Sequence, residues 1–207
     1  SQSSYWDYSD VKRMDTVDQL EAAEEVSRLF EQAVTRQLMS DVPVGSYLSG
    51  GLDSSSIAAI ARQKLGRICT FTMGFDLSSA SGMERGFDER PQAEALANRL
   101  KTEHYEMVLH AGDMEHVMPE LIWHLEDLRV GQCYPNYYVA RLAGKFVKVV
   151  LSGGGGDELF GGYPTYLGHR AAGMYAALPR VVRRPAESLL SAVPATDSPV
   201  PFSLVAR

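Results

Sequence analysis

The first forty residues place apolar side chains at helical spacing. Val17 and Leu20 begin a series that continues through Ala23, Val26, Phe30, Ala33, Val34 and Leu38. Steps of three and four residues are typical of one face of an amphipathic helix. Thr16 and Gln19 have the spacing of a capping box, which predicts that the helix begins just after Thr16.

Beyond this helix, short apolar runs alternate with longer helical patterns. The runs expected to form strands cover residues 44–48, 67–75, 104–109 and 146–152, and the helical patterns cover residues 53–65, 88–100, 113–128 and 136–145. Gly66 is well placed to end the helix over residues 53–65. The alternation predicts an α/β fold, with a parallel twisted sheet and helices on both faces. The chain after residue 163 has a helix- and loop-like pattern.

Two glycine-rich turns follow two of these strands. "SGGLDSS" (residues 49–55) comes after the first strand, and "GGGGDELFGGY" (residues 153–163) comes after the fourth. Ligands of open parallel sheets bind beyond the carboxyl ends of the strands. We therefore expect both turns to lie on one edge of the sheet, within reach of one ligand.

The first turn has the composition of an anion-binding loop. Its glycines allow backbone amides to approach an oxyanion, its serines add hydroxyl donors, and the following helix directs its N-terminus to the same place. A simpler alternative is that Asp53 caps the helix and the glycines form a tight turn. The patterns G-x-x-x-x-G-K-[ST] and G-x-S-x-G are absent, and Glu158 breaks G-x-G-x-x-G in the second turn. P-loop kinases, serine hydrolases and dinucleotide-binding proteins are therefore disfavoured.

The second turn adds the carboxylates of Asp157 and Glu158. Magnesium in proteins is often held by one or two carboxylates together with phosphate oxygens. Asp53 and Asp157, on facing turns with a polyphosphate between them, therefore form a candidate Mg²⁺ site.

The two turns together carry a family resemblance. "VPVGSYLSGGLDSS", "FTMGF", "FDE" (Phe87 to Glu89) and "KVVLSGGGGDELFGGY" occur in order between Thr16 and Tyr166. In these segments the chain resembles the synthetase domain of glutamine-hydrolysing asparagine synthetases, members of the ATP pyrophosphatase (PP-loop) family. The resemblance implies an adenine nucleotide alpha hydrolase-like fold, cut short at its C-terminus. It also implies a ligase that uses ATP and Mg²⁺ to adenylate the aspartate side chain, releasing pyrophosphate, before ammonia displaces AMP.

The resemblance also implies roles for individual residues. The loop that holds the pyrophosphate would comprise Ser49, Gly50, Gly51, Asp53, Ser54 and Ser55, while Tyr47, Leu48 and Met73 would border the adenine, and Ser152 and Gly153 would contact the AMP portion. Asp53 and Asp157 would be the catalytic pair that ligates Mg²⁺. Ordinary core packing is the alternative for the side chains of Leu48 and Met73.

Gly154 departs from the family pattern, which has an acidic residue directly after "SG". Glu126 and Asp127 are weaker candidates for that acidic role. The departure keeps two alternatives open. One is an adenylating ligase with an internal amine as acceptor, as in relatives that close β-lactam rings, and the other is a nucleotide-binding module without catalysis.

The chain also lacks parts of the family pattern at its ends. It begins with Ser1 instead of a nucleophilic cysteine, and no lysine follows Lys148. We expect residues 1–15 to be the remnant of a linker and residues 16–207 to be an incomplete synthetase domain, which takes ammonia from a glutaminase domain of a longer chain. We expect the 207-residue chain alone neither to hydrolyse glutamine nor to complete the synthetase reaction.

Composition limits the expected binding partners of the protein and its expected cellular compartment. The net charge of −6 argues against a dedicated nucleic-acid-binding protein, although Arg180 to Pro185 is locally basic. Cys69 and Cys133 do not form a C-x-x-C motif, and no apolar run approaches the roughly 20 residues of a membrane span. These features predict a cytoplasmic protein that contacts no membrane, and a homodimer is compatible with them.

Histidines and tyrosines give weaker indications. The five histidines, which are His104, His110, His116, His124 and His169, show no metal-ligand spacing, so we interpret them as surface or hydrogen-bonded core residues. Tyr134, Tyr137 and Tyr138 are candidates to line an amino-acid pocket, but packing along a helix is the favoured interpretation.

Overall fold

The computed structural model describes residues 4–11, 17–76, 78, 88–126 and 133–177. Thr16, Phe87, Asp127, Leu128 and the basic stretch Arg180 to Pro185 lie outside the described residues. The chain divides into two compact units, residues 1–39 and 40–207. Among the described residues, no helix combines the length and apolarity needed to cross a membrane.

The first unit contains a short 3₁₀ helix, η1 (Tyr8–Asp10), and the long helix α1 (Gln19–Gln37). Asp18 is the N-cap of α1, and its carboxylate accepts hydrogen bonds from the amides of Leu20 (2.8 Å) and Glu21 (3.2 Å). The expected helix is confirmed, but Gln19 is its first residue. The predicted capping box is therefore wrong, because Asp18 already satisfies the amides at the start of the helix.

The second unit is built on a four-stranded sheet in which every strand pair is parallel. Its order is β3-β2-β1-β4, with β1 at Val44–Tyr47, β2 at Cys69–Phe75, β3 at Glu103–Leu109 and β4 at Val149–Leu151. Ser46 pairs with Thr70 on one side and with Leu151 on the other. The predicted parallel α/β fold is confirmed.

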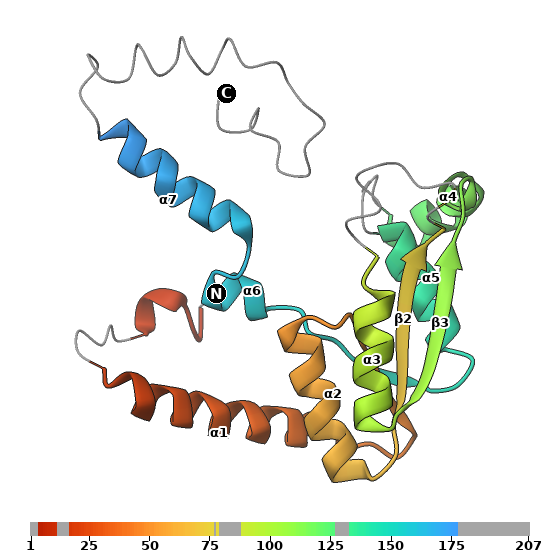
Figure 1. Cartoon of the computed structure of the whole chain (residues 1–207), viewed down its shortest axis with the longest axis horizontal. Coiled ribbons are helices and arrows are strands. Elements are labelled where there is room, and N and C mark those ends of the chain that lie inside the picture. The colour runs from red at the N-terminus through yellow and green to blue at the C-terminus, as the bar shows by residue number, and fades with distance from the viewer. Residues whose placement is uncertain (1–3, 12–16, 77, 79–87, 127–132, 178–207) are drawn as a thin grey trace. The chain divides into compact units, whose positions relative to one another are not determined.

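Helices cover both faces of this sheet (Figure 1). On one face, α2 (Leu52–Leu65) and α3 (Arg90–Leu100) enclose a cluster of Leu48, Ala58, Ala93 and Ala97. On the other face, α5 (Cys133–Ala143) packs Val139 and Ala143 against Phe71, and α4 (Asp113–Leu125) adds Val117 near Phe75 and Leu109. Three small apolar clusters therefore hold the sheet between two helical layers. The chain continues into α6 (Gly156–Phe160) and α7 (Pro164–Ala176).

Several element boundaries differ from the sequence-based expectation. Helix α4 ends at Leu125 instead of residue 128, because Glu126 takes a left-handed conformation as its C-cap. Strand β4 begins at Val149 instead of residue 146, because the amides of Phe146 and Val147 donate to the carbonyl of Ala143 at the end of α5. Those amides cannot also join the sheet. Helix α5 begins at Cys133 instead of residue 136, since Pro135 lies in the first turn, where a missing N–H costs nothing.

Phe71 is the central side chain of the core, and its truncation provides a test of the packing. The ring is fully buried, and its centroid lies 5.8 Å from that of Tyr105 and 5.9 Å from that of Phe146. We expect Phe71→Ala to lower the free energy of unfolding by about 3–5 kcal/mol, because it removes a buried ring and leaves a cavity. Urea unfolding followed by circular dichroism measures this loss. Phe146, which is 43% exposed, provides the control, and an equal loss for Phe146→Ala would contradict the assignment.

Candidate functional site

The two glycine-rich turns leave the sheet from adjacent strands. Residues 49–55 follow β1 and residues 152–156 follow β4, and these strands pair in parallel. In the order β3-β2-β1-β4, the chain moves from β1 to β2 and β3 on one side and returns on the other side with β4. The strand order therefore reverses between β1 and β4, where open α/β sheets bind their ligands.

Serine hydroxyls organise the first turn from within. The hydroxyl of Ser54 accepts a hydrogen bond from the amide of Ser49 (3.1 Å), lies 2.9 Å from the Ser49 hydroxyl and donates to the carbonyl of Gly51 (3.2 Å). The Ser49 hydroxyl in turn accepts from the Gly51 amide (3.3 Å). Gly50 takes a positive φ of 82°, which glycine adopts without strain. The loop is thus held in one shape by its own side chains.

The start of α2 presents amides and one carboxylate to the same edge. Gly51 is the N-cap and provides no side-chain cap, and Asp53 lies in the first turn. The alternative that Asp53 merely caps this helix is therefore wrong. The amide of Ser55 donates to Gly51, so the first three helical amides have no partner within the helix. Among the described residues, the Asp53 carboxylate makes no hydrogen bond or ion pair. Both features suit a ligand that brings an anion and a cation.

Glycines of the second turn lie directly against this helix start. A Cβ atom at Gly156 would lie 2.0 Å from Oδ2 of Asp53, and one at Gly153 would lie 3.0 Å from the amide nitrogen of Ser54. A side chain at Gly156 would require the Asp53 carboxylate or the turn to move, because real Cβ contacts essentially never fall below 3.0 Å. The structure therefore brings the two turns together, as the sequence predicts, with the Asp53 carboxylate between them.

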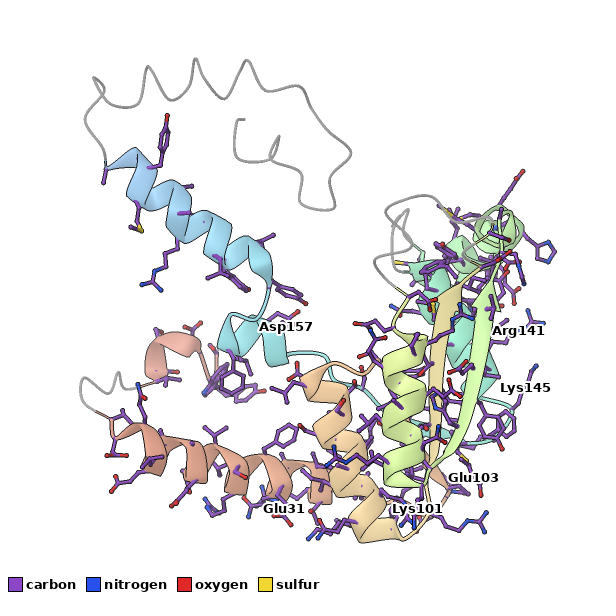
Figure 2. The ribbon with its side chains drawn as sticks, viewed as in Figure 1. Glu31, Lys101, Glu103, Arg141, Lys145 and Asp157 are labelled. Atoms are coloured by element: carbon purple, nitrogen blue, oxygen red, sulfur yellow. The ribbon has the colours of Figure 1, made fainter. Side chains whose placement is uncertain are left out.

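Asp157 extends the second turn from the first residues of α6 (Figure 2). It directly follows Gly156, so its Cα lies about 3.8 Å from the Cα that faces the Asp53 carboxylate. Among the described residues, its carboxylate has no hydrogen-bond or ion-pair partner. Glu158, in contrast, accepts a hydrogen bond from the Tyr163 hydroxyl (2.8 Å), which lowers the pKa of Glu158. Of the two neighbouring acids, Asp157 is thus the uncommitted one.

Two of the residues expected to border an adenine, Leu48 and Met73, pack in the hydrophobic core. Leu48 is 1% exposed, its amide donates to the Phe71 carbonyl (2.9 Å), and its carbonyl accepts a hydrogen bond from the Thr72 hydroxyl. Met73 packs among the aromatic residues of both clusters on the α5 side. Core packing is thus confirmed for both side chains. Tyr47 is half-buried, and Ser152 is exposed beside the second turn.

Histidine and tyrosine side chains have structural partners. His104 contacts the Thr70 hydroxyl (2.9 Å) and Glu106 (3.2 Å), and the other histidines are exposed. The hydroxyl of Tyr138 donates to the Asp113 carbonyl (3.0 Å), and the ring packs edge-on against Tyr137. The favoured interpretations of these residues are confirmed. Within the described part of the chain, no group of three or more His, Cys, Asp or Glu side chains could hold a metal ion.

Two residues beside the site were not singled out by the sequence patterns. Gly156 is one of four consecutive glycines, and only its contact with Asp53 distinguishes it from the others. Gln92 lies against Gly50, where an added Cβ would be 2.6 Å from the Gln92 Cβ. The run of four glycines could have indicated that the backbone of this turn lies close to another segment. Nothing in the local sequence indicates that Gln92 packs against Gly50. Glu126, considered for the acidic role, is the exposed C-cap of α4.

Comparison with known proteins identifies similar chains. Residues 25–198 match the family described as asparagine synthase. Over 183 residues the chain is 37% identical to a protein of Methanocaldococcus jannaschii with the provisional name asparagine synthetase [glutamine-hydrolyzing] 2, covering 86% of this chain and 33% of that protein. It is 39% identical over 143 residues to asparagine synthetase [glutamine-hydrolyzing] 1 of Bacillus subtilis, covering 69% of this chain and 22% of that protein.

The chain thus spans a third or less of the length of these two relatives. Among solved structures, it is similar to the NH3-dependent NAD synthetase of Campylobacter jejuni, with a TM-score of 0.41 and 17% identity, covering 71% of this chain and 61% of that chain.

Proposed function

The chain belongs to the asparagine synthase family, and from this premise we propose that it forms the nucleotide-binding part of an ATP-dependent carbon–nitrogen ligase. In the proposed reaction, an oxygen of the aspartate side-chain carboxylate attacks the α-phosphorus of ATP, and the bond to the departing pyrophosphate breaks. Ammonia then attacks the acyl carbon, and AMP leaves. A glutaminase domain in the same protein supplies the ammonia in this proposal, as the names of the relatives suggest for them.

One observation carries this proposal: the Asp53 carboxylate lies between two glycine turns at the point where the strand order reverses. Gly156 approaches it so closely that a methyl group would overlap Oδ2, at 2.0 Å. This close approach brings the Asp53 carboxylate and the backbone of the second turn together beside the N-terminus of α2. Backbone amides at the N-terminus of α2 favour the negative charge of phosphate groups there.

The residues of the first turn have distinct roles in this proposal. Gly50, Gly51 and the first amides of α2 bind the pyrophosphate oxygens, which carry increasing negative charge as they depart. Ser49 and Ser54 hold the loop in shape, and the Ser49 hydroxyl can donate to the ligand in place of its hydrogen bond to Ser54. Ser55, Ser152 and Gly153 stay predicted contacts, as does the backbone of Met73 near the adenine. The backbone groups of Leu48, in contrast, are already hydrogen-bonded to Phe71 and Thr72. The AMP portion then lies toward β4.

Magnesium fits the chemistry of this donor set. Asp53 and Asp157 provide hard oxygen ligands, and neither carboxylate has a hydrogen-bond or ion-pair partner among the described residues. Bound there with a polyphosphate, the ion would neutralise charge on the phosphate oxygens. The two aspartates would orient the polyphosphate through it.

Gly154 favours a second candidate, a ligase in which an amine of the activated molecule replaces ammonia. Of the described residues, a Cβ at this position would have only the Ser152 hydroxyl within 4 Å, at 3.9 Å. The space would admit a larger side chain, so the missing carboxylate is a chemical difference and is not forced by crowding. An internal amine that can attack the activated carboxylate without help from an acidic residue at position 154 is consistent with the glycine found there.

The test is pyrophosphate release from Mg²⁺–ATP by the intact protein across a panel of amino acids and related carboxylic acids. We expect release with aspartate and formation of asparagine when ammonia or glutamine is present. Release only with an acid that carries its own amine, together with a cyclic product, would favour the second candidate. ATP binding without release under every condition would leave a nucleotide-binding module without catalysis.

The proposed setting is cytoplasmic. Cys69 and Cys133 both carry free thiols, which supports a reducing compartment.

A further inference from the structure

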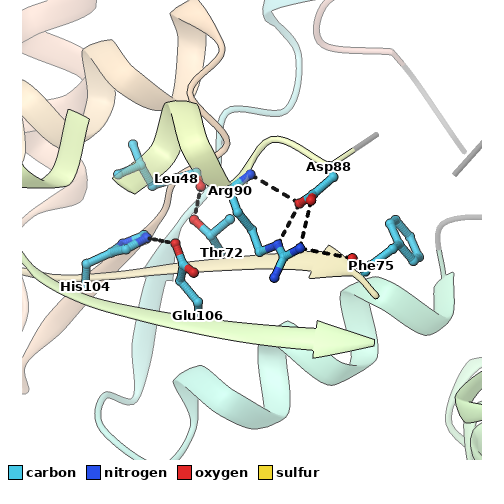
Figure 3. A network of polar contacts seen from close by, with 7 residues as sticks. All are labelled: Leu48, Thr72, Phe75, Asp88, Arg90, His104 and Glu106. Carbon is cyan, nitrogen blue, oxygen red and sulfur yellow. Dashed lines mark hydrogen bonds and ion pairs between the residues drawn. The ribbon is translucent and has the colours of Figure 1, made fainter. Parts of the chain in front are cut away.

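A partly buried ion pair between Asp88 and Arg90 lies on the face of β2 that α3 covers (Figure 3). Arg90 donates from Nε to Oδ1 of Asp88 (2.7 Å) and from its terminal nitrogen Nη2 to Oδ2 (2.8 Å), so the contact is bidentate. The side chain of Asp88 is 6% exposed and that of Arg90 is 22% exposed. The two charges are therefore largely shielded from solvent. A bidentate pair of this kind holds its two side chains in a defined geometry.

The pair ties the start of α3 to the end of β2. Arg90 is the first residue of α3, and its Nη2 also donates to the carbonyl of Phe75, the last residue of β2 (3.0 Å). Glu89, the N-cap, provides no side-chain hydrogen bond to the helix. The position of this helix start therefore depends on Asp88 and Arg90. The hydrogen bond to Arg90 holds the pKa of Asp88 below its usual value, so the carboxyl is ionised at neutral pH.

Gly74 leaves the space that the pair occupies. A Cβ at Gly74 would lie 2.2 Å from Oδ1 of Asp88 and 2.4 Å from Nε of Arg90. Any side chain at this position would displace the pair from the strand. Glycine inside a strand weakens the strand and often occurs where other atoms approach the backbone closely. At Gly74 the approaching atoms are those of the Asp88–Arg90 pair.

The first turn of α3 in turn supports the pyrophosphate loop. Gly50 lies against Gln92 and Ala93, with an added Cβ 2.6 Å from the Gln92 Cβ and 3.2 Å from the Ala93 amide nitrogen. Ala93 is fully buried in one cluster with Leu48, the residue before the loop. A continuous line of contacts therefore runs from the Asp88–Arg90 pair, through two helical residues, to the loop.

We propose that Asp88 and Arg90 are positioning residues for nucleotide binding, which hold the first turn of α3 in place behind Gly50 of the pyrophosphate loop. This inference rests on the proposed function, because it assigns the ligand of that loop as ATP. The pair does not touch the nucleotide. Its effect reaches ATP through the shape of the loop, which contacts the phosphates both before and after the reaction.

The test compares steady-state kinetics of the intact protein for Arg90→Gln, Asp88→Asn and the unaltered protein. We expect the KM for ATP to rise about tenfold, with kcat and the KM for the acid substrate within about twofold. A contact that serves bound substrate and transition state equally affects KM and leaves kcat unchanged. Arg90→Lys should also have a raised KM for ATP, because an ammonium group cannot reproduce the bidentate contact that the planar guanidinium makes with Asp88.

Gly74→Ala tests the same idea without removing either charge. Its methyl group pushes the pair off the strand, so we expect the same selective rise in the KM for ATP. Arg67→Gln is the matched control, because Arg67 forms an exposed pair with Glu103 at the opposite, amino-terminal end of the sheet. Figure 2 shows Glu103 at the beginning of β3. The control should leave every constant within about twofold.

Direct titration with Mg²⁺–ATP separates the two levels of the proposal. Absence of ATP binding by the unaltered protein would overturn the proposed function and this inference together. ATP binding by that protein, with equal affinity in Arg90→Gln and Gly74→Ala, would overturn only the inference. A lower melting temperature accompanied by an unchanged KM for ATP would also overturn it, since the pair would then serve stability alone.

Discussion

Replacing Asp53 with asparagine is expected to reduce the rate of pyrophosphate release by roughly a hundredfold to a thousandfold, the scale of losing one electrostatic group at a reacting phosphate. Asparagine has nearly the same shape, and the carboxylate makes no hydrogen bond or ion pair with the described residues, so the fold should be unaffected. The loss follows from removing the negative charge that would orient a metal-bound polyphosphate. Steady-state pyrophosphate release by the intact protein, at saturating ATP, measures it.

Asp113 provides the matched control for this substitution. It is also an acidic residue in the first turn of a helix, α4, where its carboxylate accepts the amide of His110 (2.6 Å). Asparagine can still accept that hydrogen bond, so Asp113→Asn should keep the rate within about twofold. A rate for Asp53→Asn above a third of the unaltered value would show that this carboxylate does not act in the reaction.

The second large effect is expected from Gly156→Ala, which we predict to slow pyrophosphate release by roughly a hundredfold. The added methyl group would lie 2.0 Å from Oδ2 and 2.3 Å from Cγ of Asp53, so the carboxylate or the turn must move. A displacement of about 1 Å at a reacting centre can lower the rate by roughly a hundredfold. Gly156 does not have a positive φ, so the effect is steric and involves no backbone strain. The same pyrophosphate assay measures it.

Two other glycines separate this effect from a general cost of alanine. Gly154 lies in the same turn, and the nearest described atom to an added Cβ there is the Ser152 Oγ at 3.9 Å. An added Cβ at Gly168 in α7 would meet no atom of the described residues within 4 Å. Alanine at either position should leave the rate nearly unchanged, and at Gly168 it should favour the helix by about 0.5–1 kcal/mol. Equal losses for Gly154→Ala and Gly156→Ala would contradict the assigned contact.

Much of the fold could be predicted from short segments. The four strands and the helices between them followed from local apolar patterns, because a strand buried by helices on both faces is apolar throughout. Boundaries failed where two elements competed for one backbone group. Phe146 and Val147 look like strand residues, but their amides complete the end of α5 and β4 starts later. Asp18 likewise takes the cap position that Thr16 was expected to fill.

The candidate site was predictable in its parts and less so in its contacts. The turn residues from Ser49 to Ser55, together with Asp157, could be named from their chemistry and their places after strands. Their meeting at one edge followed from the parallel sheet. The occupied backbone groups of Leu48 could not be foreseen, because they depend on the register between β1 and β2. The pairing of Asp88 with Arg90 over Gly74 depends in the same way on where α3 lies on the sheet.

The sequence by itself determined the class of fold, the two glycine turns and the acids within them, because each depends on residues that are neighbours in the chain. Only the tertiary structure decided that Gly156 lies against Asp53 and that Gln92 lies behind Gly50. Those contacts join segments far apart in the chain. Their distances are set by strand order and helix packing, to which every element of the core contributes.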